Sequence, residues 1–550
     1  MNWKKALLIL AVSFIITISL AACGGGEDNS ESAGSDENDG EEKLADEQIL
    51  NVNIATEPPS LHPQKSTDTT SAAVLDQIFE GLTRVNQDGE AENAMASDIQ
   101  LSDDKKTYTF TIREDATWSN GDPVTAKDFE YAWKWVLNPE STDTDFAYYL
   151  YPIKNAEAAK AGEVPLDEIG VTVKDDKTLV VELEQPTPYF LQSTAHFTFY
   201  PVNHHVAKAN PEWASDAGEK YVTNGPFLLD SWQHKSEIVL KKNTNYWDAE
   251  TVKLETIHML MIEDLNTELQ MYEKGELDWA GSPTGNIPQS AIPSLKQSGR
   301  LNISPLAGTY YIEFNTNQEP YNNVNIRKAL ALSINRQAIV ENVSKGGEQP
   351  AMALVPTAIW EDNEEGYFQD NHVEKAKELL EKGLEEEGLD ELPTLTFSYN
   401  TNESHAAIAQ ALQDMWRENL GLDVELHNQE WNVYLDSMSE GNYEMGRMGW
   451  LGTINDPSNF LNIFETAGGN NYTDWESEAY ANLLEQARTE TDEEARQEIL
   501  GQAEQILMDE MPIAPIYFYT NVWMNKDYVK NINVSTLGGI QYKWGYITEH

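Results

Sequence analysis

The 550-residue sequence has very little cysteine and little positive charge. Its single cysteine, Cys23, cannot form an intramolecular disulfide, so packing alone must hold the folded chain together. The 92 Asp and Glu residues against 37 Lys and Arg residues give a formal net charge of -55. Because phosphate binding requires clustered Lys and Arg, we expect no nucleic-acid partner and no affinity for anionic lipid surfaces.

The short motifs of common enzyme classes are also absent. The sequence contains no G-x-S-x-G, no phosphate loop ending in G-K-S or G-K-T, no G-x-G-x-x-G and no H-E-x-x-H. Among the ten histidines only His204 and His205 are adjacent, and neighbours in sequence rarely ligate one metal together. We therefore expect no catalytic residues, no metal site and no cofactor, and a structural or surface role for the histidine pair.

Apolar runs are short throughout the chain. The longest, Ala6–Leu20, has about 15 residues, whereas a membrane-spanning helix needs about 20. Lys4 and Lys5 precede this run and small residues follow it, a pattern typical of a secretory signal peptide over residues 1–22.

The end of the apolar run explains the position of the only cysteine. Leu20-Ala21-Ala22-Cys23 resembles the bacterial lipobox, which implies that Cys23 is acylated, becomes the mature N-terminus and holds the protein on the outer face of the cytoplasmic membrane. The alternative is ordinary secretion with an incidental cysteine. Glycine, serine and carboxylates follow Cys23, so we expect residues 23–49 to form a disordered acidic tether that reaches about 25 to 30 Å.

Short strands and amphipathic helices alternate along the rest of the chain. Thr107–Ile112 alternates polar and apolar residues, the period of a half-buried strand, and a helix is expected to start at Thr125 with Asp128 in its first turn. This mixture predicts α/β domains, and about 500 residues exceed one core, so we expect two or three of them. Further strands are predicted at 179–183, 238–240, 395–399 and 424–426, and helices at 325–343, 373–387, 405–420 and 475–508, the last broken near 491–494.

Several long stretches resemble one protein family in the same order along the chain. TYTFTIREDATWSNGDPVTAKDFEYAW (107–133) resembles the segment that marks extracytoplasmic solute-binding proteins of the peptide, nickel and opine ABC importers. The stretches that resemble the oligopeptide-binding branch of this group are GPFLLDSWQHKSEIVLKKNTNYWD (225–248), YIEFNT (311–316), NIRKALALSINRQAI (325–339) and NQEWNVYLDSMSEGNYEMGRMGW (428–450). The resemblance covers nearly everything from Leu50 to His550.

The resemblance implies an α/β fold of the periplasmic-binding-protein type, with two lobes around a ligand cleft, a hinge and an extra smaller domain. Two crossings, near Leu306–Thr309 and Pro512–Ile516, would form the hinge. The implied bounds are 50–68, 200–305 and 514–550 for lobe I, 69–199 for the extra domain and 306–513 for lobe II.

The implied function is that of a membrane-anchored, monomeric receptor of an ABC importer, which captures oligopeptides and delivers them to the permease without chemistry. One alternative is the same fold with another solute, such as nickel, a sugar or a modified peptide. A second alternative, from another class, is a secreted lipoprotein hydrolase.

The resemblance also implies how a peptide would be bound. Its backbone would lie between two extended stretches, Glu57-Pro58-Pro59 and Gly449-Trp450-Leu451, because main-chain pairing does not depend on side chains. Trp431 and Trp450 match pocket aromatics of the family, and plain core packing is the alternative for each.

Charged ends of the peptide need partners of opposite charge, because an unpaired buried charge costs several kcal/mol. His405 and Arg447 match positions that meet the ligand carboxylate. Thr453 stands where relatives have the aspartate that pairs with the ligand α-amine. We expect a weaker dependence on a free N-terminus, unless Asp456 or another carboxylate in the cleft takes the amine. Asp456 lies in a turn-like Asn-Asp-Pro sequence, which favours a structural role.

Overall fold

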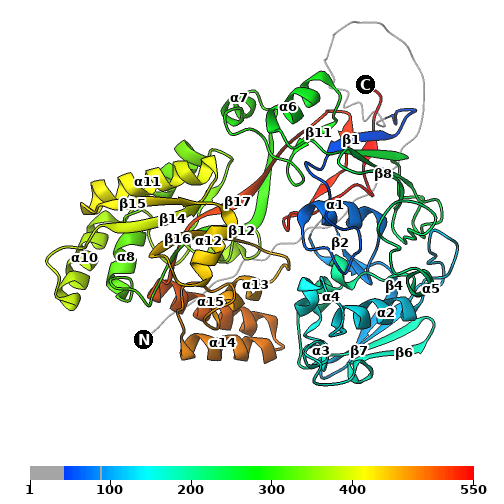
Figure 1. The fold of residues 1–550 in the computed structure, drawn as a ribbon, viewed down its shortest axis with the longest axis horizontal. Coiled ribbons are helices and arrows are strands. Elements are labelled where there is room, and N and C mark those ends of the chain that lie inside the picture. The colour runs from blue at the N-terminus through cyan, green and yellow to red at the C-terminus, as the bar shows by residue number, and fades with distance from the viewer. Residues whose placement is uncertain (1–42, 87–88) are drawn as a thin grey trace, which may run out of the picture. The chain divides into compact units, whose positions relative to one another are not determined.

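The computed structural model describes residues 43–86 and 89–550, and residues 44–550 form one compact unit (Figure 1). The expected signal peptide, the expected lipidation site Cys23 and most of the expected tether lie outside the described residues. Within the described ranges, no helix combines the length and apolar character that crossing a membrane requires.

A mixed four-stranded sheet begins the compact unit, in the order β1-β10-β9-β8. Leu44 bridges to Thr548, and the Ala45 N–H donates to the Ile547 carbonyl at 2.9 Å, so the described fold starts before Ile49, the expected end of the tether. The pairing of β1 with β10 is parallel and the others are antiparallel. The strands are β1 (Ile49–Asn53), β8 (Phe227–Gln233), β9 (Glu237–Lys242) and β10 (Thr256–Leu260).

A second sheet, β4-β5-β7-β6, is entirely antiparallel. Its strand β5 has the predicted bounds, and α2 is capped by Thr125 as predicted, because the Asp128 carboxylate accepts from the Thr125 N–H at 2.8 Å and from its hydroxyl at 3.0 Å. One continuous apolar core joins this sheet to the first, and it also contains residues of α1. The elements are β4 (Ala96–Leu101), β5 (Thr107–Ile112), β6 (Val171–Asp175), β7 (Thr178–Glu182), α1 (Thr69–Ile78) and α2 (Ala126–Leu137).

A seven-stranded sheet, ordered β11-β17-β12-β16-β14-β15 with β13 beside β17, organises the other half of the unit. Alternate residues of β12 enter different cores, because successive side chains of a strand point to opposite faces: Tyr310 and Ile312 pack with residues of α8 and α11, and Tyr311 packs with residues of α14 and α15. The strands are β11 (Trp279–Gly281), β12 (Asn302–Phe314), β13 (Gln349–Pro350), β14 (Leu395–Asn400), β15 (Val424–Gln429), β16 (Met445–Leu451) and β17 (Ile513–Asn525).

The predicted helices of this half are confirmed with one correction. The helix predicted over 325–343 is wrong as one element, because it ends at Leu332 and restarts at Arg336, where the Asn335 side chain accepts from the Ala338 N–H at 2.9 Å. The break predicted near 491–494 lies between α14 and α15, with Asp492 as the cap of α15. The helices are α8 (Val324–Leu332), α9 (Arg336–Ile339), α10 (Val373–Glu387), α11 (Glu403–Leu420), α12 (Trp431–Ser439), α13 (Ser458–Leu461), α14 (Glu478–Thr489) and α15 (Glu493–Glu510).

Shorter elements complete the fold. They are β2 (Thr83–Val85), β3 (Ala91–Asn93), β18 (Val529–Lys530), β19 (Asn533–Val534), β20 (Ile540–Gln541), β21 (Tyr546–Ile547), α3 (Ala156–Lys160), α4 (Phe190–Ser193), α5 (His204–Ala209), α6 (Leu265–Lys274) and α7 (Ile292–Gln297).

The long strands β12 and β17 pair with each other, and their ladder is irregular at two places. The first irregularity separates the pair Pro305–Thr520 from the pair Thr309–Phe518. The second lies between Tyr310 and Tyr311 and skips Ile516 on the opposite strand. The two irregularities fall inside the two segments where the crossings between the lobes were expected.

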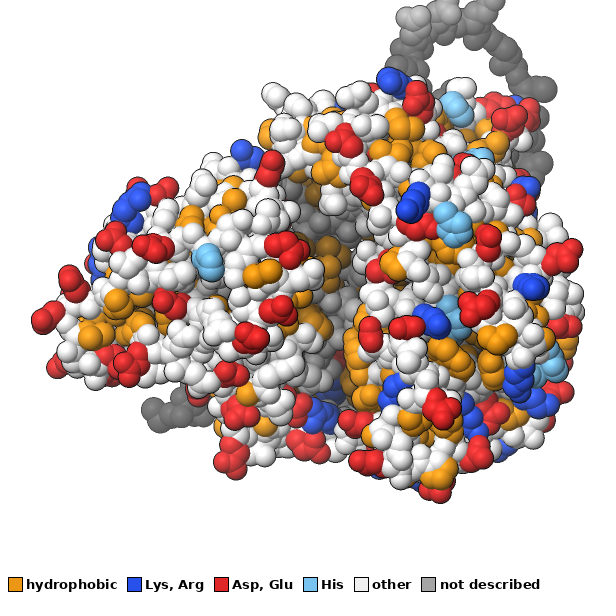
Figure 2. Space-filling model, viewed as in Figure 1, with side chains coloured by type: hydrophobic (Ala, Val, Ile, Leu, Met, Phe, Trp, Pro, Cys, Tyr) orange, Lys and Arg blue, Asp and Glu red, His pale blue; other side chains and the backbone are white. Residues whose placement is uncertain are grey.

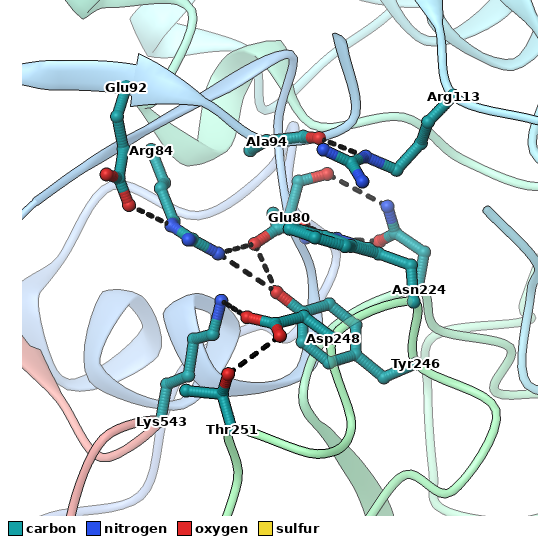
Figure 3. A network of polar contacts seen from close by, with 11 residues as sticks. Glu80, Arg84, Glu92, Ala94, Arg113, Asn224, Tyr246, Asp248, Thr251 and Lys543 are labelled. Carbon is teal, nitrogen blue, oxygen red and sulfur yellow. Dashed lines mark hydrogen bonds and ion pairs between the residues drawn. The ribbon is translucent and has the colours of Figure 1, made fainter. Parts of the chain in front are cut away.

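A buried polar network joins Glu80, just after α1, to segments far away in the sequence (Figure 3). The Glu80 carboxylate accepts from Arg84 at 3.0 Å, from the Tyr246 hydroxyl at 2.5 Å and from the Trp247 indole at 2.7 Å. Beside it, the Lys543 ammonium lies 2.7 Å from the Asp248 carboxylate and is 3% exposed. Residues 246–248 therefore contact both Glu80 and the C-terminal segment that contains Lys543.

Replacing Glu80 by Gln is expected to lower the free energy of unfolding by about 3 kcal/mol, because it removes the buried charge that Arg84 faces. Glu92→Gln is the matched control, since Glu92 also pairs with Arg84 but has a 36% exposed side chain. Its loss is expected to stay below about 1 kcal/mol. Urea unfolding of the two variants measures both losses. Equal losses would contradict the buried role of Glu80.

Candidate ligand-binding site

The strand β16 has a backbone edge that no other strand covers. On one side it pairs with β12 along its whole length, from Met445 to Leu451. On the other side it pairs with β14 only at Met445 and Gly446. From Arg447 to Leu451 the second edge thus has no strand partner within the described chain, and an extended peptide can add there through its main chain.

Gly449 lies in the middle of this edge. A Cβ at this position would lie 2.6 Å from the Tyr519 hydroxyl, so any side chain here would require the Tyr519 side chain to shift. The absence of a side chain therefore lets the backbone of β16 lie directly against Tyr519.

Arg447 is a buried cation without a partner of opposite charge. It is 8% exposed, and its guanidinium lies 4.9 Å from the ring centroid of Tyr310. Its Nε makes no hydrogen bond, and no carboxylate of the described residues forms an ion pair with it. Because an uncompensated buried charge is costly, Arg447 can stabilise an anion that reaches it.

His405 of α11 lies next to the same tyrosine. Its ring centroid is 5.6 Å from that of Tyr310, and its Nδ1 is buried without a hydrogen-bond partner. Burial, assisted by the positive charge of Arg447, lowers the pKa of His405 to about 3. His405 is therefore neutral at pH 7, where its imidazole can donate one hydrogen bond to a carboxylate. The structure brings the two predicted carboxylate partners together around Tyr310.

The two predicted pocket tryptophans differ in their surroundings. Trp431 begins α12, is 41% exposed and stacks on Tyr434 with ring centroids 6.1 Å apart. Leu451, at the end of β16, is 49% exposed. Trp450 is half-buried and packs against the core cluster of α14 and α15. Core packing therefore does not account for Trp431, whereas it accounts for part of Trp450.

The predicted second stretch, Glu57-Pro58-Pro59, follows β1. The Glu57 carboxylate lies 2.7 Å from His234 Nδ1 and accepts from the Lys235 N–H. Pro58 is buried and Pro59 is exposed. Within residues 43–86 and 89–550, no hydrogen bond joins this stretch to β16.

Thr453 and Asp456 have different roles. The Thr453 hydroxyl accepts from the Tyr149 hydroxyl at 2.7 Å, and its N–H donates to Asn459 at 3.0 Å. The Asp456 carboxylate is buried and forms an ion pair with Arg496 at 2.8 Å. The interpretation of Asp456 as structural is confirmed, so it is not free to bind a ligand amine.

A cavity of about 270 Å³ has Thr453 in its wall. Most of the wall comes from residues 67–76, 192–200 and 535–541, and Arg84, Val85, Phe146, Pro283 and Thr284 complete it. Sequence reasoning missed these segments because they are far apart in the chain. The face drawn in Figure 2 is hollowed near its centre, between the regions where Figure 1 labels α12 and α1. Hydrophobic side chains are visible inside the hollow.

No group of three or more His, Cys, Asp or Glu that could hold a metal ion occurs among the described residues. The ring centroids of the adjacent His204 and His205 lie 3.9 Å apart. His204 also lies 2.7 Å from the Asp128 carboxylate at the start of α2.

Comparisons with known proteins identify the family of this chain and a similar relative. Residues 90–472 match the family of bacterial extracellular solute-binding proteins, family 5, middle part. The oligopeptide-binding protein OppA of Bacillus subtilis is 51% identical over 549 residues, which cover 99% of each chain.

Solved structures agree with the sequence comparison. The Escherichia coli murein tripeptide binding protein MppA superimposes with a TM-score of 0.76 at 33% identity, covering 92% of this chain and 100% of that one. The Haemophilus influenzae OppA in complex with the peptide RPPGFSPFR has a TM-score of 0.75 at 32% identity, with the same coverage. The two-lobed α/β fold expected from the sequence is confirmed by these structures.

The lowered pKa of His405 predicts that its ring stays neutral when the pH falls from 8 to 5. A histidine with its ordinary pKa near 6.5 would gain a proton over this range. In NMR spectra, the His405 ring signal, identified by its loss in His405→Gln, should not shift across this range. Because the unfolded chain takes up this proton below about pH 6.5 and the folded chain does not, His405→Gln should reduce the loss of stability toward acid pH. A His405 signal with a midpoint near 6.5 would contradict the burial argument.

Proposed function

The chain belongs to the bacterial extracellular solute-binding proteins of family 5, and we propose that it is the membrane-anchored receptor of an ABC importer for oligopeptides. It captures peptides outside the cytoplasmic membrane and delivers them to the permease. The observation that carries this proposal is the buried, unpaired Arg447 on the open backbone edge of β16.

An open strand edge beside an unpaired cation suits a peptide with a free carboxylate. The peptide backbone pairs with the free main-chain groups between Arg447 and Leu451, which gives affinity regardless of side chains. The Arg447 carbonyl is not among them, because it accepts from the Tyr434 hydroxyl at 2.6 Å. The peptide carboxylate neutralises Arg447 and accepts a hydrogen bond from the neutral His405. The exposed Trp431 supplies an aromatic surface for a peptide side chain. Pro58 and Pro59 of the opposite stretch lack N–H donors, so only carbonyls are available there.

Closure of the cleft follows from the same assignment. Lobe I comprises 50–68, 200–305 and 514–550, lobe II comprises 306–513, and the extra domain comprises 69–199. The irregular ladder between β12 and β17 supports a hinge, because unpaired strand residues absorb rotation with fewer broken hydrogen bonds than a regular ladder.

The related proteins named above are binding proteins, and the proposal includes no catalytic step. A solute other than a peptide would leave the carboxylate partners and the open edge without a matching ligand. A hydrolase would fragment a bound peptide. Mass spectrometry of peptides recovered from the complex separates a receptor from a hydrolase, because a receptor releases the peptides intact and a hydrolase releases fragments.

Amidation of the peptide carboxylate is expected to weaken binding to the wild-type protein about 30-fold or more, because it leaves the buried Arg447 unpaired. In Arg447→Met the buried charge is gone, and amidation should cost less than about threefold. Calorimetry with a pentapeptide and its amide measures both differences.

Arg417→Met is the control for this experiment. Arg417 lies on α11, as does His405, but its side chain is 56% exposed and pairs with Asp414. Its response to amidation should equal that of the wild type. An equal cost of amidation in Arg447→Met and in the wild type would remove Arg447 from the carboxylate site.

Anchoring of the protein depends on Cys23, the only cysteine of the chain. Cys23→Ser should move the protein from the membrane fraction into the medium and abolish its labelling by palmitate, because no other thiol can be acylated. Fractionation and labelling of cells that express each form provide the measurement. A variant that stays in the membrane fraction would show that the anchor is not Cys23.

A further inference from the structure

The wall of the 270 Å³ cavity contains three charged side chains, Asp68, Arg84 and Asp76. They differ in the partners that they already have within the protein. The Asp68 carboxylate caps α1 and accepts from the Ser71 N–H at 2.8 Å and from its hydroxyl at 2.6 Å. Arg84 is held by Glu80 and Glu92. The third group, Asp76, is the one with unused hydrogen-bonding capacity.

Asp76 lies in the third turn of α1, on the cavity wall that also includes Thr453. Its Oδ1 accepts from the Tyr200 hydroxyl at 2.9 Å. Its Oδ2 makes no hydrogen bond within the described residues, and a Cβ placed on Gly539 would lie 3.9 Å from it. One carboxylate oxygen thus remains available to a group that enters the cavity.

The surroundings of Asp76 favour a cation as that group. Burial raises the pKa of Asp76 to about 7, while the hydrogen bond from Tyr200 opposes the rise. His196, also in the wall, brings no positive charge at neutral pH, because burial lowers its pKa to about 3. The rest of the wall is largely apolar, including Ala72, Ala195 and Phe197. A low-dielectric wall strengthens the attraction between a carboxylate and an entering cation.

We propose that Asp76 binds an ammonium group of the peptide ligand in the cavity that Thr453 lines. The proposal rests on the proposed function. It names Asp76 as the partner of the ligand's positive charge, for which the rest of the site offers no carboxylate. Thr453 offers only a hydroxyl, which Tyr149 already engages, and Asp456 is held by Arg496. The negative charge for the ligand is therefore supplied by α1.

An ammonium group of a peptide has two sources, the N-terminal amine and a lysine side chain. Four peptides of one length separate them: a lysine-free peptide with a free or an acetylated N-terminus, and an acetylated peptide with lysine or norleucine at its first position. In one of the two pairs, loss of the ammonium group should weaken binding to the wild type about tenfold or more. The pair that shows this loss identifies the source.

The decisive variant is Asp76→Asn, which keeps the size and the acceptor for Tyr200 but removes the charge. In this variant the loss in the sensitive pair should fall below about threefold. Asp68→Ser is the matched control, because it removes the other cavity carboxylate and keeps a side chain that caps a helix. Its loss should equal that of the wild type. Melting temperatures of the variants confirm that each one is folded.

The wild-type protein provides a second test that needs no variant. The other acidic and basic groups in the wall of this cavity are Asp68, Arg84, His196 and Tyr200, of which Tyr200 contacts Asp76. An ammonium group favours the ionised carboxylate, so binding releases a proton, and affinity for the sensitive peptide should rise as the pH increases from 6 to 8. The acetylated, lysine-free peptide should show no such rise.

The outcomes distinguish this inference from the proposed function. If the wild type binds peptides but the loss is the same in Asp76→Asn, or if neither pair shows a loss, the role of Asp76 is wrong and the receptor function stands. If no peptide binds to the wild type, the proposed function itself is wrong. If Asp76→Asn still binds the peptide without the ammonium group, and no longer prefers the peptide that has it, the result supports both the role of Asp76 and the receptor function.

Discussion

The pairing of β12 with β17 on one side and with β16 on the other is the constraint on which the ligand site depends. β12 contributes Tyr310, whose ring lies between His405 and Arg447, and it holds β16 in the register that leaves the edge from Arg447 to Leu451 open. The same strand runs past the two irregularities of its ladder with β17. The proposed binding edge and the two irregularities are therefore parts of one hydrogen-bonded assembly, because the second irregularity lies within the stretch of β12 that pairs with β16.

Ionisable groups in the interior are paired with an opposite charge, neutralised by protonation or left without a charged partner. The degree of burial alone does not show which of these applies to a given group. Asp456 is compensated by Arg496, so it stabilises the fold and is not available to a ligand. Glu313 is fully buried with both oxygens unbonded, and burial raises its pKa far above the usual range, so it stays protonated in a closed core. Arg447 cannot lose its proton in this way, and Asp76 lies on a cavity wall. In the proposed complex, the ligand compensates these two charges.

Main-chain pairing and charged ends make separate contributions to recognition. A strand edge accepts any peptide backbone, but it does not specify which residue pairs with which, because every peptide unit offers the same donor and acceptor. Fixed charges remove this ambiguity, since the carboxylate and the ammonium group occur at defined places in the ligand. With a cation on β16 and an anion on α1, the peptide would be aligned by its charged groups while its other side chains remain free to vary.

The sequence by itself determined the local elements and the family. The alternation of Thr107–Ile112 and the cap at Thr125 act within a few residues, so they predicted β5 and the start of α2 correctly. The turn-like surroundings of Asp456 likewise predicted its structural role. The helix over 325–343 was predicted wrongly, because the cap formed by Asn335 competes with continuation of the helix and its apolar periodicity does not reveal the break.

Only the tertiary structure decided which groups are available to the proposed ligand. The open edge of β16 exists because β14 pairs with just two of its residues, and no local pattern records where a neighbouring strand stops. Asp76 is separated by 124 residues from Tyr200, whose hydroxyl binds it. The environment of a charge depends on segments brought together by folding. Its availability to a ligand is therefore a property of the packed chain and not of the residues beside it in sequence.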